Sequence, residues 1–364
     1  MILVSGAAPR YNEVWIVPVA GSVFIQEEGS GMFTFVVTCY QQAEVIAMAL
    51  ESVAYQIQRY GQGRRFQLIV TDDCSTDGSR SVIRQWLARN ESLFEETDLI
   101  FSPENAGICR IYVEALRRVK GDAFLVFNGD DVLAPYNVFE SVAKLDEYDI
   151  AATAFLRFTG SGDFMTAYRT YLEVVLQQVI RGRVLQGAIR LGCPLMGVAL
   201  YRKSLVTEEV LAHILRFRTV NDRACLQKIV TGNPGIKVCY INRPLVLYRV
   251  SNTSLSHFDS PSRILHNREI ALLCRIQRSS EKSPLFRLLL LLQERSTRFR
   301  ESPNRYVRLL RFFSPYFALM FWLYLRHFRQ LHALERELVD RHLGDCQDHY
   351  RTIAGRAGAY GVSS

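Results

Sequence analysis

Short apolar runs alternate with longer, helix-patterned segments between residues 33 and 131. A short run rich in β-branched and aromatic residues predicts a buried strand, whereas apolar residues every three or four positions predict an amphipathic helix. The predicted strands cover residues 33–38, 66–70, 99–101 and 123–127, and the predicted helices cover residues 43–58, 78–90 and 108–119. Strands that alternate with helices form a parallel sheet with helices on both faces. The sequence therefore predicts an α/β fold with a mainly parallel sheet.

Acidic side chains directly follow two of the predicted strands. Asp72 and Asp73 come after the second strand, and Asp130 and Asp131 come after the fourth. Open α/β sheets bind ligands at the carboxyl ends of their strands, so the loops there are expected to converge. These loops are residues 38–42, 71–77 and 128–131. Paired carboxylates suit Mg²⁺ or Mn²⁺, but such acids also lie in solvated turns or cap the helices that follow.

Four ordered motifs resemble those of the family 2 inverting glycosyltransferases, which have the GT-A fold. They are Val36-Val37-Thr38-Cys39-Tyr40 with Leu50-Glu51-Ser52-Val53-Ala54-Tyr55-Gln56; Ile69-Val70-Thr71-Asp72-Asp73-Cys74-Ser75-Thr76-Asp77-Gly78-Ser79; Asn105-Ala106-Gly107; and Asn128-Gly129-Asp130-Asp131 with Pro135. The resemblance covers about residues 33–255 and leaves the two ends of the chain unexplained. It implies a GT-A domain that binds a nucleotide sugar.

The resemblance assigns a nucleotide-binding role to eight residues. They are Thr38, Tyr40, Glu44, Asp72, Asp73, Asn105, Gly129 and Asp130. Asp72 and Asp73 match the pair that holds ribose and uracil or thymine, with Asp73 favoured for the base. Asp130 and Asp131 match the metal-binding acids, which implies Mn²⁺ or Mg²⁺ as cofactor. Asn128 replaces the first acid of many such motifs, and its amide oxygen is a weaker, neutral ligand.

A later segment, residues 219–232, carries the candidate catalytic base. Taken alone it is typical of a helix capped by Asn221 or Asp222 and ended by Gly232. In the family it resembles the helix that bears the base, and Asp222 takes that position, while Asn221 stands where Glu is usual. Arg249 and His257 lie in a segment that resembles one facing the diphosphate or acceptor. A structural role for His257 is also open.

Cysteine spacing, hydropathy and charge indicate the cellular compartment and the possible partners of the protein. The eight cysteines are scattered without a C-x-x-C pair, which argues against a zinc site and is typical of a cytosolic protein. No signal peptide or membrane-spanning run is predicted, so we expect a cytoplasmic protein. The net charge of +8 would suit nucleic acid, an anionic membrane face or anionic substrates, but no nucleic-acid-binding module is recognisable.

The C-terminal part combines apolar and basic residues. Residues 312–328 are rich in aromatic and aliphatic side chains, and five arginines flank them. These arginines are Arg305, Arg308, Arg311, Arg326 and Arg329. The pattern predicts peripheral contact of residues 285–329 with an anionic membrane at the inner face. A helix that packs on the catalytic domain or forms a homo-oligomer is the alternative.

These observations give one domain organisation and one favoured function. We expect an N-terminal extension (1–31), a GT-A domain (32–258, with nucleotide-sugar half 32–135 and acceptor half 136–258), a basic helical region (259–354) and a disordered tail (355–364). The favoured function is metal-assisted transfer of a sugar, with inversion, from a UDP- or dTDP-sugar to a glycan or lipid-linked acceptor in bacterial surface polysaccharide synthesis. The alternatives are a catalytically silent nucleotide-sugar-binding protein and, with less support, a nucleotidyltransferase.

Overall fold

Four strands form the parallel half of a mixed sheet in the computed structural model of the protein. They are β1 (Met32–Cys39), β2 (Arg65–Asp72), β3 (Glu96–Phe101) and β4 (Ala123–Asn128). They lie in the order β3-β2-β1-β4, and each neighbouring pair is parallel. The described residues are 31–167, 171–180, 182–193, 198–250, 261–299 and 304–360. The four predicted strands and their parallel pairing are thus confirmed.

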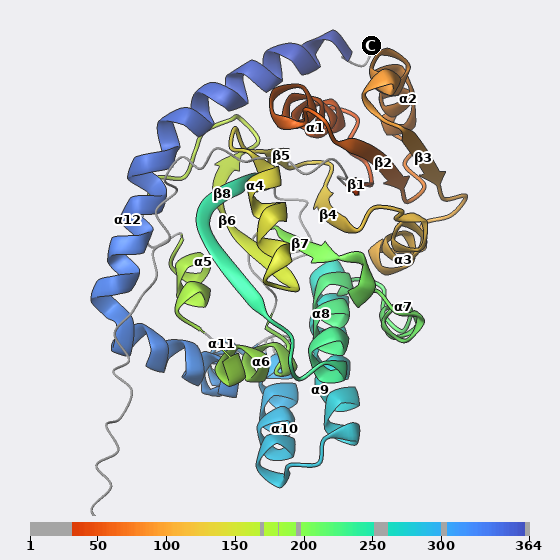
Figure 1. Ribbon diagram of the computed structural model, residues 1–364. Coiled ribbons are helices and arrows are strands. Elements are labelled where there is room, and N and C mark those ends of the chain that lie inside the picture. The colour runs from red at the N-terminus through yellow and green to blue at the C-terminus, as the bar shows by residue number, and fades with distance from the viewer. Residues whose placement is uncertain are drawn as a thin grey trace, which may run out of the picture. The chain divides into compact units, whose positions relative to one another are not determined.

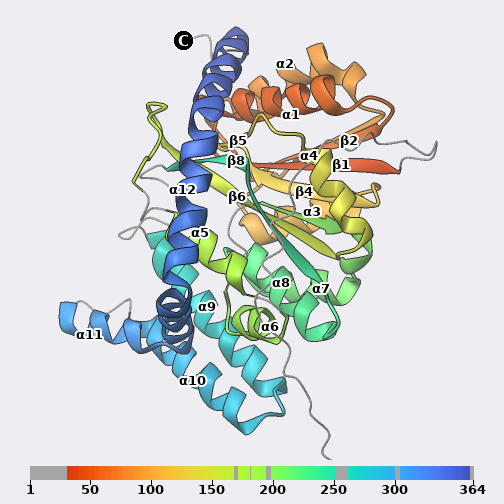
Figure 2. The same cartoon turned by 60° about the vertical axis from the view of Figure 1, so that its left-hand side comes forward.

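Helices cover both faces of this parallel half, as predicted. They are α1 (Ile46–Tyr60), α2 (Ser79–Asn90) and α3 (Ile108–Arg118). Figures 1 and 2 show α1 and α2 on one face of the sheet and α3 on the other. Each helix buries an apolar face against the strands, and Trp86 of α2 is wholly buried. Its indole N–H donates to the buried carboxylate of Glu51 on α1 (2.8 Å), which satisfies both groups.

The second half of the sheet is mixed in direction. It holds β5 (Val132–Leu133), β6 (Ile150–Thr159), β7 (Ala199–Arg202) and β8 (Val238–Val250). Strand β7 runs antiparallel to both β4 and β6, and β8 runs parallel to β6. Strand β8 continues across Pro244. Its register against β6 shifts near Pro244, because proline has no N–H to continue the ladder.

Short helices accompany the second half of the sheet. They are α4 (Val138–Val142), α5 (Leu172–Leu176), α6 (Gly182–Arg190), α7 (Glu208–Ile214) and α8 (Asn221–Gly232). The predicted helix around residues 219–232 is therefore confirmed as α8. It begins directly after Val220, and no side chain caps it from that position, so the predicted cap at Asn221 or Asp222 is wrong.

Four helices make up the C-terminal region. They are α9 (Pro261–Ser280), α10 (Pro284–Phe299), α11 (Arg305–Leu309) and α12 (Pro315–Ala357). Helix α12 changes direction at His327, whose backbone angles (φ −113°, ψ 19°) are not helical. Its later part runs along the sheet domain, beside α5, β8 and α1, to the neighbourhood of α2 (Figures 1 and 2). Leu331, Leu338 and Ile353 of α12 belong to the same apolar core as the sheet. No described helix has the length and apolarity needed to cross a lipid bilayer.

The two ends of the chain differ from what the sequence predicted. Residues 355–364 were expected to be disordered, but α12 continues to Ala357 and a short 3₁₀ turn spans Gly358–Tyr360. Tyr360 is buried, because its hydroxyl accepts a hydrogen bond from Asn90 (3.2 Å) and its ring lies under the Arg89 guanidinium (4.9 Å). These contacts order the tail as far as residue 360. The predicted extension at residues 1–31 lies almost wholly outside the described residues.

Candidate active site

Three loops meet at the carboxyl edge of the parallel strands, as predicted. In the strand register Cys39 lies beside Asp72, and Thr38 lies beside Asn128. The Asp73 amide donates to the Cys39 carbonyl (3.0 Å), and the Thr38 hydroxyl donates to the Asn128 side-chain oxygen (3.1 Å). The loops that follow β1, β2 and β4 therefore share one site. Tyr40 and Glu44 lie at its exposed rim, with Tyr40 48% exposed.

The first two loops are joined by hydrogen bonds from backbone to side chain. The amide of Gln41 donates to the Ser75 hydroxyl (2.8 Å), and the amide of Ala43 donates to the Asp77 carboxylate (2.9 Å). Burial raises the pKa of Asp77, but hydrogen bonds from Ala43 and Ser79 outweigh it and hold the pKa below its usual value. Gln41 (φ 53°) and Cys74 (φ 65°) both adopt left-handed backbone angles. Such strained non-glycine residues cluster at functional sites.

The two acids after β2 have different surroundings. Asp73 is buried, and its two carboxylate oxygens accept the amides of Ala106 and Gly107, each at 2.8 Å. Asp72 is wholly buried, and one of its oxygens, Oδ1, accepts from Arg80 (2.5 Å) and the Ser75 amide (3.0 Å). Its other oxygen, Oδ2, is buried and has no partner among the described residues. Asp73 thus holds a neighbouring loop, whereas Asp72 keeps a free acceptor.

The loop that Asp73 holds also contacts the segment before α8. Arg218 donates to the Asn105 carbonyl (2.8 Å) and to the Asn105 side chain. Gly107 has a φ of +90°, and a Cβ there would lie 2.3 Å from the Arg218 side chain. Only glycine can therefore occupy this position without displacing the arginine. The contact links the loop beside Asp73 to the helix that carries Asp222.

The loop after β4 places the candidate metal-binding acids. Asp131 is 4% exposed and accepts the Arg249 amide (2.9 Å), while the Asp130 carbonyl accepts from the Arg249 guanidinium (2.8 Å). Burial raises the pKa of Asp130; burial and the Asp130 charge together raise that of Asp131 well above its usual value. A bound cation would oppose both shifts. Close approach of the loop requires Gly129, since a Cβ there would lie 2.4 Å from Ile46.

The donor set fits a divalent cation only with help from a ligand. Among the described residues no three His, Cys, Asp or Glu side chains gather into a metal site. Asp130 supplies a half-buried carboxylate, and Asn128 supplies an amide oxygen that already accepts from Thr38. Mg²⁺ and similar ions are commonly held by one or two carboxylates together with substrate phosphates. The site therefore suits a cation that arrives with a diphosphate.

Two further predicted residues are only partly placed. Arg249 is 6% exposed: its guanidinium lies over the Phe158 ring (4.6 Å) and reaches the Met48 sulfur (3.5 Å). Its described contacts are therefore internal and brace the Asp130–Asp131 turn, so direct contact with a diphosphate stays a prediction. His257 lies outside the described residues.

Asp222 lies in the first turn of α8 and is exposed. One of its oxygens accepts the Arg223 amide (2.7 Å). Its charge acts on Cys109 and Tyr112 of α3, whose pKa values are raised mainly by burial. A helix N-terminus stabilises an anion, so the carboxylate can be both part of a helix start and a base. Sequence reasoning missed Arg80, which contacts Asp72 and the Ser102 carbonyl, and Arg218, whose partner Asn105 is 113 residues away; no local pattern marks either residue.

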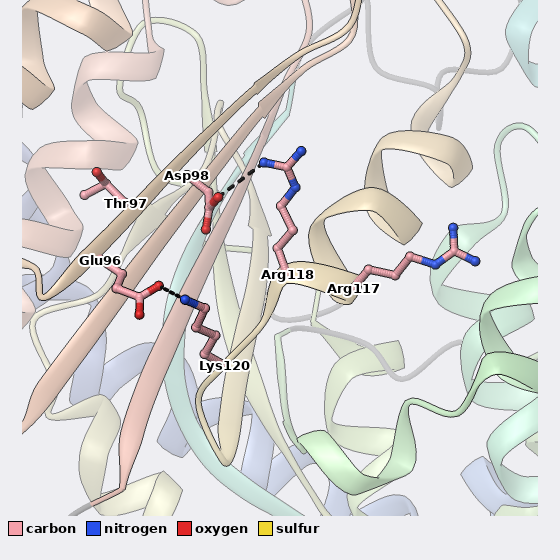
Figure 3. Close-up of a pocket in the computed structure, with 6 residues that line it drawn as sticks. All are labelled: Glu96, Thr97, Asp98, Arg117, Arg118 and Lys120. Atoms are coloured by element: carbon pink, nitrogen blue, oxygen red, sulfur yellow. Dashed lines mark hydrogen bonds and ion pairs between the residues drawn. The ribbon is translucent and has the colours of Figure 1, made fainter.

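An open hollow elsewhere on the surface does not belong to this site. Figure 3 shows its lining residues, which are Glu96, Thr97, Asp98, Arg117, Arg118 and Lys120. It lies at the start of β3, opposite the edge where the loops converge. Lys120 pairs with Glu96 (2.5 Å) and Arg118 with Asp98 (3.2 Å), while Arg117 points away toward Glu208. Ion pairs satisfy most of these charges, so the hollow suggests no ligand.

Comparison with known proteins agrees with this geometry. Residues 34–208 match the family model described as glycosyl transferase family 2. Abequosyltransferase RfbV of Salmonella typhimurium is 25% identical over 249 residues, which cover 64% of this chain and 71% of that protein.

Solved structures share the fold. Staphylococcus aureus TarS 1–349 superposes with a TM-score of 0.52 at 16% identity, over 90% of this chain and 92% of that chain. The same protein has also been solved in complex with UDP. The mannosyltransferase PcManGT of Pyrobaculum calidifontis, in complex with GDP-Man and Mn²⁺, has a TM-score of 0.52 at 16% identity, over 92% and 87% of the two chains. At such identities the likeness shows the GT-A fold alone.

Proposed function

The domain matched over residues 34–208 belongs to family 2 of the glycosyltransferases, and we propose that it transfers a sugar from a nucleoside diphosphate donor to a hydroxyl group. The observation that carries this proposal is the convergence of three loops at one sheet edge, two of which carry paired acids. One loop offers the free oxygen of Asp72, and another offers the Asp130 carboxylate. These two features match the base and the diphosphate of a single ligand.

We propose Asp72, rather than Asp73, for contact with the base. An unpartnered carboxylate oxygen can accept the imide N–H of uracil or thymine. The carboxylate of Asp73 is already engaged by the amides of Ala106 and Gly107, so its role is to hold that loop. UDP- and dTDP-sugars are the donors that this assignment favours.

Asp130 would hold Mn²⁺ or Mg²⁺ together with the donor diphosphate. The cation supplies charge neutralisation of the leaving group when it is bound. Asp131 supports this position indirectly, because it accepts the amide of Arg249, which in turn holds the Asp130 carbonyl. Thr38 fixes the side chain of Asn128 beside it.

Asp222 would act as the base in a single displacement. Its carboxylate takes the proton of the acceptor hydroxyl while that oxygen bonds to the anomeric carbon. The bond from that carbon to the diphosphate oxygen breaks, and its electron pair leaves with the nucleotide. Attack opposite the leaving group inverts the anomeric configuration, which NMR of the product would report.

The first experiment is a thermal-shift screen with UDP-, dTDP- and GDP-sugars, each with and without Mn²⁺. We expect a rise in melting temperature for a uridine or thymidine donor that depends on the metal. Asp130→Asn should remove the metal-dependent part, whereas the control Asp98→Asn, in the ion-paired hollow of Figure 3, should retain it. A thermal shift without turnover would favour the silent-binding alternative, which Asn128 and Asn221 support. A wild-type protein that responds to none of these donors would count against a nucleotide-sugar site.

A membrane-bound acceptor is the second part of the proposal. Large apolar side chains are exposed on α11, on the 3₁₀ turn that follows it (Leu310–Phe313) and on the first part of α12, including Phe313 (80%) and Leu325 (60%). On α12, Phe317, Phe321, Leu325 and Phe328 recur every three or four residues and so form one stripe. The sequence between Glu301 and Glu335 holds five arginines and no acid. Exposed aromatics with cationic neighbours suit an anionic lipid surface, here on the cytoplasmic side.

Flotation with vesicles tests this contact. The full chain should float with vesicles containing anionic lipid and much less with neutral vesicles, and added salt should weaken binding. A lipid-linked glycan of the kind used for bacterial surface polysaccharides would then be the acceptor class. Absence of flotation, with self-association in solution instead, would assign the exposed stripe to a homo-oligomer.

A further inference from the structure

Helix α9 inserts a buried carboxylate beside the start of α8. Glu269 is 9% exposed, and its Oε1 accepts the amide of Arg218 (2.7 Å). Its Oε2 accepts both the amide (2.7 Å) and the hydroxyl (2.5 Å) of Thr219. The Glu269 carboxylate thus binds three donors from two consecutive residues. These three hydrogen bonds attach the carboxylate to the backbone and side chain of the turn before α8.

These bonds fix the turn that leads into α8. Thr219 precedes Val220, the position at which a capping side chain would normally sit, and valine cannot cap. Glu269 therefore supplies, from another helix, acceptors for backbone amides just before the helix begins. Asp222 lies only three residues beyond Thr219, in the first helical turn. A shift of the turn would carry the Asp222 carboxylate with it.

The same turn contacts the nucleotide side of the site. The Arg218 carbonyl accepts the Cys109 amide (3.3 Å), and the Arg218 guanidinium holds Asn105. Asp73 in turn holds the Asn105–Gly107 loop through the amides of Ala106 and Gly107. Hydrogen bonds thus run without a break from α9, through the Arg218 turn and the Asn105–Gly107 loop, to the end of β2.

We propose that Glu269 is a positioning residue that aligns Asp222 with the bound nucleotide sugar. The inference rests on the proposed function, since it assumes that Asp222 is the base. It makes the C-terminal helical region part of the catalytic apparatus, although Glu269 lies well beyond the segment that matches the family model. A carboxylate is suited to this place because its two oxygens can accept the two diverging amides together.

The test compares two buried polar residues of α9. Glu269→Ala removes all three bonds to the start of α8, and Gln277→Ala removes the one bond that α9 receives from Thr231 near the end of α8 (3.0 Å). Glu269→Gln retains an acceptor oxygen and should recover part of the activity. We expect Glu269→Ala to lower kcat by about tenfold to a hundredfold with little change in the donor KM. Gln277→Ala should leave kcat near wild type at a comparable loss of melting temperature.

Amide hydrogen exchange provides a second test of the proposal, and this test does not depend on enzymatic turnover. Glu269→Ala should speed exchange at residues 218–224 and also at 105–109, whereas Gln277→Ala should not. If Glu269→Ala fails to fold, both kcat and amide hydrogen exchange are measured on Glu269→Gln instead. Equal kcat losses in the two α9 variants, or unchanged exchange at 105–109, would overturn the proposal. A wild-type protein inactive with every donor would refute the proposed function, and the exchange result would still decide whether Glu269 couples the two segments.

Discussion

The sheet domain and the C-terminal helical region differ in how many large apolar side chains they expose to solvent. Among the described residues, four large apolar side chains of the sheet domain are exposed, against fifteen in α9 to α12. The four are Tyr40, Val184, Leu215 and Val250. Helices on both faces of the sheet bury its apolar side chains. The helices of the C-terminal region pack on one side only, so apolar side chains on their other side stay exposed. The difference indicates that the exposed apolar side chains of the helical region form a contact surface.

The helical region is itself divided. Glu269 of α9 and the later part of α12 direct polar groups into the sheet domain. There the Nε2–H of His349 donates to the Leu133 carbonyl (3.0 Å), and Nδ1 of His342 forms a hydrogen bond with the Tyr136 hydroxyl (2.8 Å). The first part of α12 instead directs Phe321 and Leu325 outward. One part of the region therefore completes the sheet domain, and the other remains available for a surface.

The largest expected effect lies within the sheet domain. Asp222→Asn should lower kcat by about a thousandfold, because an amide cannot take the acceptor proton, while donor binding by thermal shift persists. The control Glu208→Gln alters an acid in the first turn of the neighbouring helix α7 and should leave kcat unchanged. Near wild-type turnover in Asp222→Asn would remove the assigned base from the mechanism.

A smaller effect is expected at the loop that joins the two regions. Gly107→Ala and Gly78→Ala impose similar left-handed strain, with φ of +90° and +91°. Only at Gly107 would the new Cβ meet Arg218; nothing lies within 4 Å at Gly78. Gly107→Ala should therefore cost about 2–3 kcal/mol in unfolding free energy and reduce kcat, whereas Gly78→Ala should cost about 1 kcal/mol. Denaturant unfolding and initial rates would measure the unfolding free energy and kcat of both variants. Equal losses in the two variants would show that the Arg218 contact makes no difference.

Acid should loosen the part of α12 that packs on the sheet domain. Burial is the main cause that lowers the pKa of His342 and of His349 to about 4. Because the folded-state pKa lies below the usual 6.5, the folded state binds fewer protons than the unfolded state. Stability is thus complete above pH 6.5 and falls as the pH drops toward 4, by about 1–3 kcal/mol per histidine. The unfolding free energy, measured between pH 6.5 and pH 4, should depend less steeply on pH in His349→Gln than in the wild type. An identical slope would show that His349 does not contribute to the pH dependence.

The smallest expected effect concerns the outer surface of α12. Phe321→Ser with Leu325→Ser should weaken binding to anionic vesicles by about tenfold, because two apolar side chains no longer enter the lipid. The melting temperature should stay unchanged, since both residues are largely exposed. The matched control, Leu215→Ser, removes an exposed leucine of the sheet domain and should leave vesicle binding intact. Equal vesicle binding by all variants would remove the proposed role of this surface.

Much of the sheet domain could be predicted because its signals are local. The apolar runs at 33–38 and 123–127 specify strands wherever they lie, and acids just past a strand end reach the same edge. The antiparallel direction of β7 and the ordered turn at Tyr360 could not be predicted in this way. Both depend on partners far away in sequence, namely β4 and Asn90.

The alternation of strands and helices, the acid pairs at the strand ends and the presence of a helix around Asp222 were predictable from the sequence, since each depends on residues only a few positions apart. Contacts between distant segments, in contrast, set which of the two acids keeps a free oxygen. Asp72 and Asp73 are adjacent and chemically identical, yet Asp73 is occupied by amides 33 and 34 residues away. Such contacts also let Glu269, 50 and 51 residues from its partners, brace the turn before α8. A hydrogen-bond partner is chosen by proximity in space, which periodicity and spacing along the chain do not encode.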